Sequence, residues 1–94
     1  MRITECLWKP QFVSKLEQKH HVLKHEVGEV FENNPHFDFV AKGRVKGENV
    51  YWALGQTDAG RYLTIYFIYK RRGIAMPISA RDMNAKEWRR YERN

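Results

Sequence analysis

The run from Arg61 to Tyr69 constrains the fold most strongly, because Thr64 is the only residue after Arg61 in it that is neither aromatic nor aliphatic. Aromatic and β-branched side chains in such a run are typical of a β-strand buried on both faces. A polar turn with a glycine follows at Lys70 to Gly73, and Ile74 to Ser79 is predicted to be the partner strand of a hairpin. We therefore expect this hairpin to form the centre of a β-sheet.

Length and charge limit what can surround that sheet. With 94 residues, the chain is predicted to form a single domain over residues 1–94 with one modest core. Its net charge of +6 indicates attraction to polyanions or to an acidic partner protein. Met1 to Trp8 includes Arg2 and Glu5, and no apolar run approaches the roughly 18 residues of a membrane span. We therefore expect no signal peptide, no membrane insertion and a cytoplasmic location.

The cysteine and acidic residues argue against a disulfide framework or a metal centre. Cys6 is the only cysteine, which excludes an internal disulfide and argues against a cysteine zinc site. Aspartate, glutamate and histidine do not recur at the spacing of metal ligands. We therefore expect no metal site and no cofactor.

The N-terminal part of the chain is predicted to be mainly helical. Arg2 to Trp8 indicates a short strand or an extended lead-in. Pro10 suits the first turn of a helix, whose apolar positions then continue at helical spacing to His20. A second helical pattern covers Lys24 to Glu32. We expect two short helices joined by a turn near His21.

After a stop signal at Asn33 to Pro35, the pattern becomes strand-like. His36 to Lys42 alternates apolar and polar residues, and Asn49 to Gly55 indicates a further strand. Asn84 to Glu87 fits a capping box, so a helix of about two to three turns is expected to begin there. The sum is an α+β fold: an antiparallel β-sheet of about four strands, with two N-terminal helices and one C-terminal helix.

Residues near the C-terminus can supply the chemistry of RNA cleavage without a metal. That reaction needs a base for the 2′-hydroxyl, donors for the charge on phosphorus and an acid for the leaving oxygen. Glu87 and Tyr91 lie one helical turn apart, and Arg81 at a strand end can reach a phosphate. His20 can titrate near neutral pH. We expect Arg81 and Glu87 to converge on one open, positively charged site.

The same residues also have structural interpretations. Glu87 is equally expected as the acid of the capping box, and Arg81 as the ion-pair partner of Glu87 or Asp82. Tyr91 and Trp88 are spaced to pack the last helix onto the sheet.

Contacts to RNA are predicted from basic and aromatic side chains. The basic candidates for phosphate contacts are Lys42, Arg44, Arg61, Arg72, Arg89 and Arg90. The candidate rings for stacking on bases are Tyr51, Trp52, Tyr62, Tyr66, Tyr69 and Tyr91. Most of these rings are expected in the core instead, above all Tyr66 inside the apolar run.

Several short motifs together resemble the BrnT family of type II toxin–antitoxin ribonucleases. The matching residues are Trp8, Lys19-His20, Val22, Val30-Phe31, Leu54-Gly55, Gly60-Arg61, Ile78-Ser79-Ala80-Arg81, Glu87, Arg89 and Tyr91. The resemblance implies a fold like RelE-type toxins and metal-independent cleavage of RNA that inhibits translation. It also implies neutralisation by a ribbon-helix-helix antitoxin in a hetero-oligomer, with operator DNA bound only through that antitoxin.

Carried over residue by residue, the resemblance makes Arg81 a phosphate-binding or catalytic residue. The other residues that it places at the site are Glu87, Arg89 and Tyr91 on the last helix, Arg61 as a second positive group, and His20 at the family's Lys-His pair.

The chain also departs from the family pattern. His21 stands where glycine is usual, Lys15 where asparagine is usual, and Met76-Pro77 where a strand arginine and an aliphatic residue are frequent. Losing that arginine leaves an alternative open: a noncatalytic basic module of the same fold that binds RNA or protein. Pro77 removes a backbone donor, which predicts an edge strand or a bulge.

Overall fold

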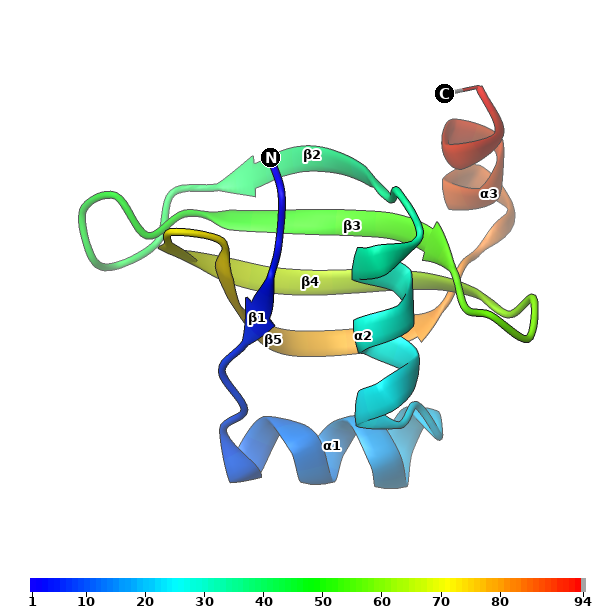
Figure 1. Ribbon diagram of the computed structural model, residues 1–94, viewed down its shortest axis with the longest axis horizontal. Helices are drawn as coiled ribbons and strands as arrows, with labels where there is room; N and C mark the ends of the chain where they lie inside the picture. Colours follow the sequence, from blue (N-terminus) through cyan, green and yellow to red (C-terminus); the bar gives the residue numbers. More distant parts are fainter. Residues whose placement is uncertain (94) are drawn as a thin grey trace.

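A five-stranded sheet forms the centre of the fold in the computed structural model, which describes residues 1–93 (Figure 1). Its strands lie in the spatial order β1 (Glu5–Cys6), β5 (Ile74–Asp82), β4 (Tyr62–Arg71), β3 (Val50–Gln56) and β2 (His36–Ala41). The pairs from β5 to β2 are antiparallel, whereas β1 runs parallel to β5. The predicted α+β class is confirmed, and the sheet gains a fifth strand where the sequence indicated a strand or a lead-in.

The helices of the described residues are α1 (Pro10–His20), α2 (Lys24–Glu32) and α3 (Ala85–Glu92). The turn predicted near His21 is confirmed: His21 adopts the left-handed conformation with φ of 54°, and the next N–H donates to the carbonyl of Leu16 at 3.1 Å. Each of these helices is too short and too polar to cross a membrane.

The helices α1 and α2 cover one face of the sheet (Figure 1). The hydrophobic core lies between these helices and the sheet. Leu16 of α1 and Val27 and Val30 of α2 are at most 1% exposed, as are Ile65 and Phe67 of β4. Burying a side chain of this size stabilises the fold by roughly 1.5–3 kcal/mol. Strand alternation explains which residues of β4 are in the core, because residues 63, 65 and 67 point to this face.

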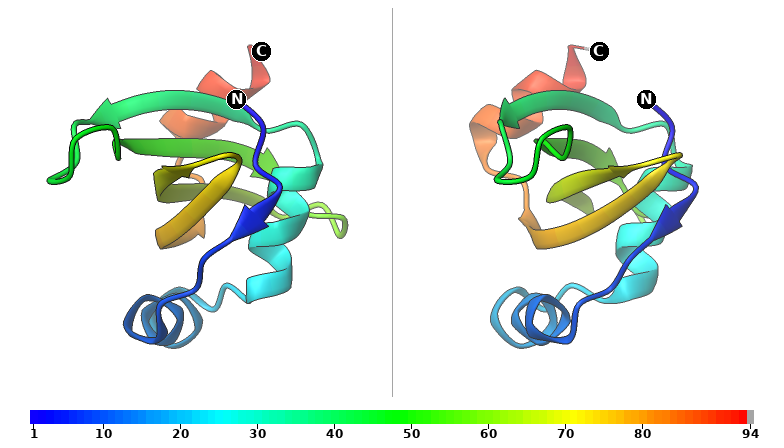
Figure 2. Two further views of the ribbon diagram at one scale, coloured as in Figure 1. Left: turned by 60° about the vertical axis from the view of Figure 1, so that its left-hand side comes forward. Right: turned by 90° about the vertical axis from the view of Figure 1, so that its left-hand side faces the viewer.

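Within the described residues, the opposite face of the sheet carries only α3, which lies over one end of it (Figure 2). Trp52 of β3 and Tyr66 and Ile68 of β4 are half-buried on this face, which we call the open face. The expectation that Tyr66 belongs to the core is therefore wrong. Its neighbours Ile65 and Phe67 fill the core, so strand alternation turns Tyr66 outward.

A bulge interrupts β5 at the proline. Ser79 lies opposite Tyr66 and Pro77 lies opposite Phe67, so Ile78 is an extra residue in the ladder. The predicted bulge is confirmed, and its physical reason is that Pro77 has no N–H to donate. Bulges bend the strand that carries them. This one lies immediately before the segment that delivers Arg81.

Candidate active site

Arg81 and Glu87 form a two-point ion pair where β5 passes into α3. The Arg81 Nη1 and Nη2 atoms donate to the Glu87 Oε1 and Oε2 atoms, each at 2.7 Å. Thr64 of β4 donates its hydroxyl to Glu87 Oε1 at 2.9 Å, and the Asn84 backbone N–H donates to the same oxygen at 2.9 Å. Glu87 is 4% exposed, whereas the Arg81 side chain is 32% exposed. The carboxylate is therefore inside the junction and the guanidinium at its surface.

Local sequence explains why Glu87 is buried there. Asn84 caps α3 by accepting the Glu87 N–H at 2.8 Å, and Glu87 returns a hydrogen bond to the Asn84 N–H. The predicted capping box is confirmed. Thr64 faces α3 from the sheet, directly across from Arg81 in the β4–β5 ladder. The two structural interpretations of Glu87, cap and ion-pair partner, are thus both correct.

The protonation state of Glu87 follows from these contacts. Burial alone would raise the pKa of Glu87, but hydrogen bonds from Arg81, the Asn84 N–H and Thr64 hold that pKa below its usual range. A carboxylate with four donors around it and a lowered pKa is a poor proton acceptor. The arrangement suits Glu87 to position Arg81 rather than to act as a general base.

Arg81 keeps donors for a ligand. Its hydrogen bonds to Glu87, together with one from Nη1 to the Asp82 carbonyl at 3.3 Å, use three of the five N–H groups of a guanidinium. The guanidinium carbon lies 5.8 Å from the centre of the Tyr66 ring on the open face. The hydrogen bond with Glu87 raises the pKa of Arg81, and a guanidinium is in any case always charged in proteins. Two N–H groups remain for Tyr66 and for an incoming anion.

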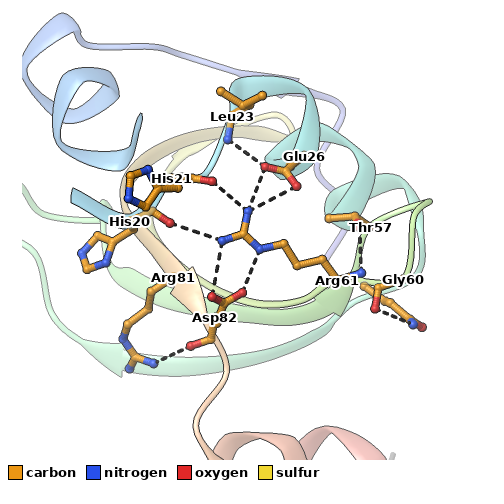
Figure 3. Close-up of polar contacts among 10 residues, drawn as sticks. His20, His21, Leu23, Glu26, Thr57, Gly60, Arg61, Arg81 and Asp82 are labelled. Atoms are coloured by element: carbon orange, nitrogen blue, oxygen red, sulfur yellow. Dashed lines mark hydrogen bonds and ion pairs between the residues drawn. The ribbon is translucent and has the colours of Figure 1, made fainter. Parts of the chain in front are cut away.

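Arg61 holds three segments together, as Figure 3 shows. Its Nε donates to Asp82 at the end of β5 at 2.8 Å, and its Nη1 donates to Glu26 of α2 at 3.1 Å. The carbonyls of His20 and His21 accept from Nη2 and Nη1 at 3.2 and 2.8 Å. With its nitrogens occupied in this way, Arg61 is poorly placed to bind a phosphate, and we leave it out of the proposed RNA contacts.

Replacing Arg61 by alanine should lower the free energy of unfolding by roughly 2–3 kcal/mol, because two carboxylates and two carbonyls lose their shared partner. Urea denaturation at pH 7 measures this. Arg44→Ala is the matched control, since Arg44 is exposed and makes no ion pair within residues 1–93, and it should change stability by less than about 0.5 kcal/mol. Equal effects of the two substitutions would show that the Arg61 contacts contribute nothing.

His20 is fixed near the junction by the same cluster. Its carbonyl is held by Arg61, and its imidazole lies on the Arg81 side of that cluster in Figure 3. The pKa of Asp82 is lowered first by the hydrogen bond from Arg61 and, in smaller part, by the charge on His20. The structure therefore places His20 near Asp82, the residue next to Arg81, although the two are far apart in sequence.

The remaining predicted residues of α3 divide between packing and surface. Tyr91 packs against Tyr62 of β4 with ring centres 6.0 Å apart, and it lines a surface depression of about 420 Å³ with His36. Arg90 pairs with Asp38 of β2 through two hydrogen bonds of 3.2 and 3.1 Å. Arg89 is exposed and makes no ion pair with any residue from 1 to 93. Tyr91 lies one turn of α3 beyond Glu87.

Asp38 of β2 links α3 to β3 and β2, the last two strands in the order of the sheet. It accepts from Arg90, from Trp52 Nε1 at 2.8 Å, and pairs with His36 Nε2 at 3.0 Å. The hydrogen bond from Arg90 is the main cause that lowers the pKa of Asp38 to about 2 from 3.8. Sequence patterns did not indicate this cluster, whose only local sign is the outward position of Asp38 in an alternating strand.

Asp38→Asn should lower stability at pH 7, and the difference from wild type should vanish in acid. Because the pKa of Asp38 is depressed in the folded state, its stabilising contribution is present above about pH 4 and is lost as the pH falls through about 2. Urea denaturation at neutral pH and at about pH 2 tests this. A difference in the free energy of unfolding between wild type and Asp38→Asn that is the same at both pH values would contradict the lowered pKa assigned to Asp38.

The predicted basic residues of the hairpin turns lie at the other end of the molecule. Lys42 and Arg44 are in the β2–β3 loop and Arg72 is in the β4–β5 turn, and these two loops lie at the end of the sheet away from α3 (Figure 1). All three side chains are exposed. At the Arg81 junction, in contrast, Glu87 and Asp82 offset much of the positive charge. The basic residues thus form two separate groups, one near α3 and one at these two loops.

Within residues 1–93, no three His, Cys, Asp or Glu side chains are grouped so as to hold a metal ion. The fold and the junction define a small basic α+β protein that presents one charged guanidinium, held by a buried carboxylate, beside an open sheet face. The chain belongs to the BrnT family, the ribonuclease toxins of type II toxin–antitoxin systems, whose family model matches residues 8–87. That match includes Arg81 and Glu87 and confirms the resemblance seen in the sequence. No curated protein matches the chain.

Proposed function

We propose that this protein is an endoribonuclease that cleaves RNA at a phosphate bound by Arg81, without a metal, and thereby inhibits translation. The observation that carries the proposal is the junction itself: a permanently charged guanidinium at the surface, oriented by a carboxylate that is 4% exposed. Family membership supplies the reaction class, and it implies an RNA substrate and an antitoxin partner.

Arg81 is assigned the role of stabilising the negative charge that develops during the reaction. When the 2′-oxygen attacks phosphorus, charge grows on the phosphoryl oxygens, and preorganised donors stabilise that charge most. Arg81 meets this requirement because the ion pair to Glu87 fixes its orientation before RNA arrives. Glu87 therefore acts through Arg81 as a positioning residue, and Thr64 in turn helps to hold Glu87.

His20 and Tyr91 are the candidates for proton transfer. The 2′-hydroxyl gives its proton to a base as the new O–P bond forms, and the 5′-oxygen gains a proton as its bond to phosphorus breaks. Arg61 binds both the carbonyl of His20 and the carboxylate of Asp82, the residue next to Arg81, and Tyr91 lies one turn from Glu87 on α3. An imidazole nitrogen can accept a proton and suits the base, whereas a phenol hydroxyl can donate one and suits the acid.

The basic residues outside the junction are assigned to phosphate contacts along the RNA. These are Arg89 and Arg90 on α3 and Lys42, Arg44 and Arg72 at the far end of the sheet. Such contacts strengthen binding without reading sequence, and they weaken as salt rises.

The partner of the toxin is proposed to be a ribbon-helix-helix antitoxin. It would form a hetero-oligomer with this protein, and operator DNA would be bound through the antitoxin alone. The reaction is placed in the cytoplasm, where translated RNA is available. The position at which relatives often carry a strand arginine is Met76, which is 8% exposed. This loss of a charged donor favours the second candidate function, a noncatalytic module that binds RNA or a protein.

Purified protein incubated with end-labelled RNA and EDTA separates these functions. We expect cleavage products that end in a 2′,3′-cyclic phosphate and a 5′-hydroxyl, and no cleavage of RNA carrying 2′-O-methyl groups throughout. Cleavage that stops in EDTA would refute metal independence. Retention of RNA without any product would support the noncatalytic module instead.

A further inference from the structure

Two aromatic rings form a pair on the open face. Trp52 of β3 lies opposite Tyr66 of β4, and the ring centres are 6.0 Å apart with an interplanar angle of 53°. Both side chains are half-buried, and the indole N–H is fixed by Asp38 at 2.8 Å. The helices α1 and α2 cover the other face of the sheet, and α3 covers only one end of this one (Figure 2). The pair is therefore partly exposed, and the hydrogen bond to Asp38 holds its indole in place.

The aromatic pair continues directly into the candidate active site. Arg81 lies 5.8 Å from the centre of the Tyr66 ring, and Tyr66 is opposite Ser79, two residues before Arg81 on β5. A guanidinium and two rings thus follow one another across three neighbouring strands. Single-stranded nucleic acid is bound by this combination, in which a cation holds the phosphate and aromatic faces hold the bases.

We propose that Trp52 and Tyr66 form a stacking platform for unpaired nucleobases next to the phosphate that Arg81 binds. The inference rests on the proposed function and adds to it a second part of the substrate site. It assigns a single-stranded RNA substrate, because bases that are paired and stacked in a duplex cannot lie on the two rings. The two N–H groups that Arg81 keeps beside Glu87 can donate to a phosphate, which favours a polyanion over a neutral peptide on this face.

An uncleavable oligonucleotide of about six 2′-O-methyl nucleotides tests the platform, together with the same oligonucleotide carrying abasic sites. The phosphates are identical in the two probes. Stacking contributes roughly 1–3 kcal/mol per base, so wild type should bind the intact probe about 10-fold more tightly or better. Tyr66→Leu should lose that preference, whereas Tyr66→Phe, which keeps the ring, should retain it.

Matched variants separate stacking from folding. Trp52→Phe keeps a ring but loses the hydrogen bond to Asp38, and it should bind the intact probe more tightly than Trp52→Leu. Phe39→Leu is the control, because Phe39 is 56% exposed and packs against Tyr51, which faces the core side. It should bind both probes as wild type does. Urea denaturation of each variant shows whether the fold is kept.

The outcomes distinguish this inference from the proposed function. Equal binding of the two probes by wild type, with binding still weakened by Arg81→Gln, would overturn the platform and leave the ribonuclease proposal intact. Failure of wild type to bind or cleave any RNA would refute both. Ring substitutions that spare RNA binding but weaken antitoxin binding would show that the face holds protein, which also overturns the platform.

Discussion

Arg81→Gln should lower kcat/KM for RNA cleavage by roughly 100- to 1,000-fold, because it removes the main donor proposed for the charge that develops on phosphorus. Arg81→Lys should recover only part of this loss, since an ammonium cannot hold Glu87 at two points and also reach a phosphate. Initial rates on a labelled single-stranded RNA measure both effects. Arg2→Gln is the matched control, because Arg2 is exposed and lies outside the junction, and its rate should equal that of wild type.

Arg81→Gln will also cost stability, and a double variant separates the two effects. Removing Arg81 leaves the buried carboxylate of Glu87 without its cation, which we expect to cost about 1–3 kcal/mol given that Arg81 is 32% exposed. In Arg81→Gln/Glu87→Gln the buried charge is gone as well, so stability should recover in part while cleavage stays low. Recovery of cleavage along with stability would mean that Arg81 acts only on the fold.

Glu87→Ala should be the most destabilising single substitution in the junction. It leaves the Thr64 hydroxyl, which is 0% exposed, without an acceptor and removes half of the capping box. We expect a loss of roughly 2–4 kcal/mol in the free energy of unfolding. Thr64→Val, which removes only one donor to the carboxylate, should cost less. Urea denaturation of the two variants gives the comparison.

The effect of Glu87 on cleavage should identify its role. Because the pKa of Glu87 is held below its usual range, its protonation does not shape the rate between about pH 5 and 9. Glu87→Gln should therefore lower kcat, as Arg81 loses its orientation, yet keep the shape of the pH–rate profile. If the acidic limb of that profile disappeared in Glu87→Gln, Glu87 would be the general base and the positioning role would be wrong.

Much of the fold was predictable because its signals are local. The capping box needs only Asn84 and Glu87, the bulge follows from the missing N–H of Pro77, and the helix boundaries follow from Pro10 and the residues around His21. Each of these rules acts over a few residues of chain. The antiparallel hairpins follow from short turns between strands in the same way.

The parts that the sequence did not reveal depend on contacts between distant segments. Glu26 lies far before Arg61 in the chain and Asp82 lies far after it, so the role of Arg61 in holding the fold cannot be predicted from residue spacing. The parallel pairing of β1 with β5 and the approach of Thr64 to Glu87 have the same origin. Tyr66 was misassigned because a continuous apolar run hides which residues face the helices.

A crystal structure of this protein with an uncleavable 2′-O-methyl RNA tests the central claim most directly. A phosphate oxygen should lie about 2.8 Å from an Arg81 nitrogen, with the ion pair between Arg81 and Glu87 intact. RNA phosphates bound only by the loops that carry Lys42, Arg44 and Arg72, with none at Arg81, would contradict the account.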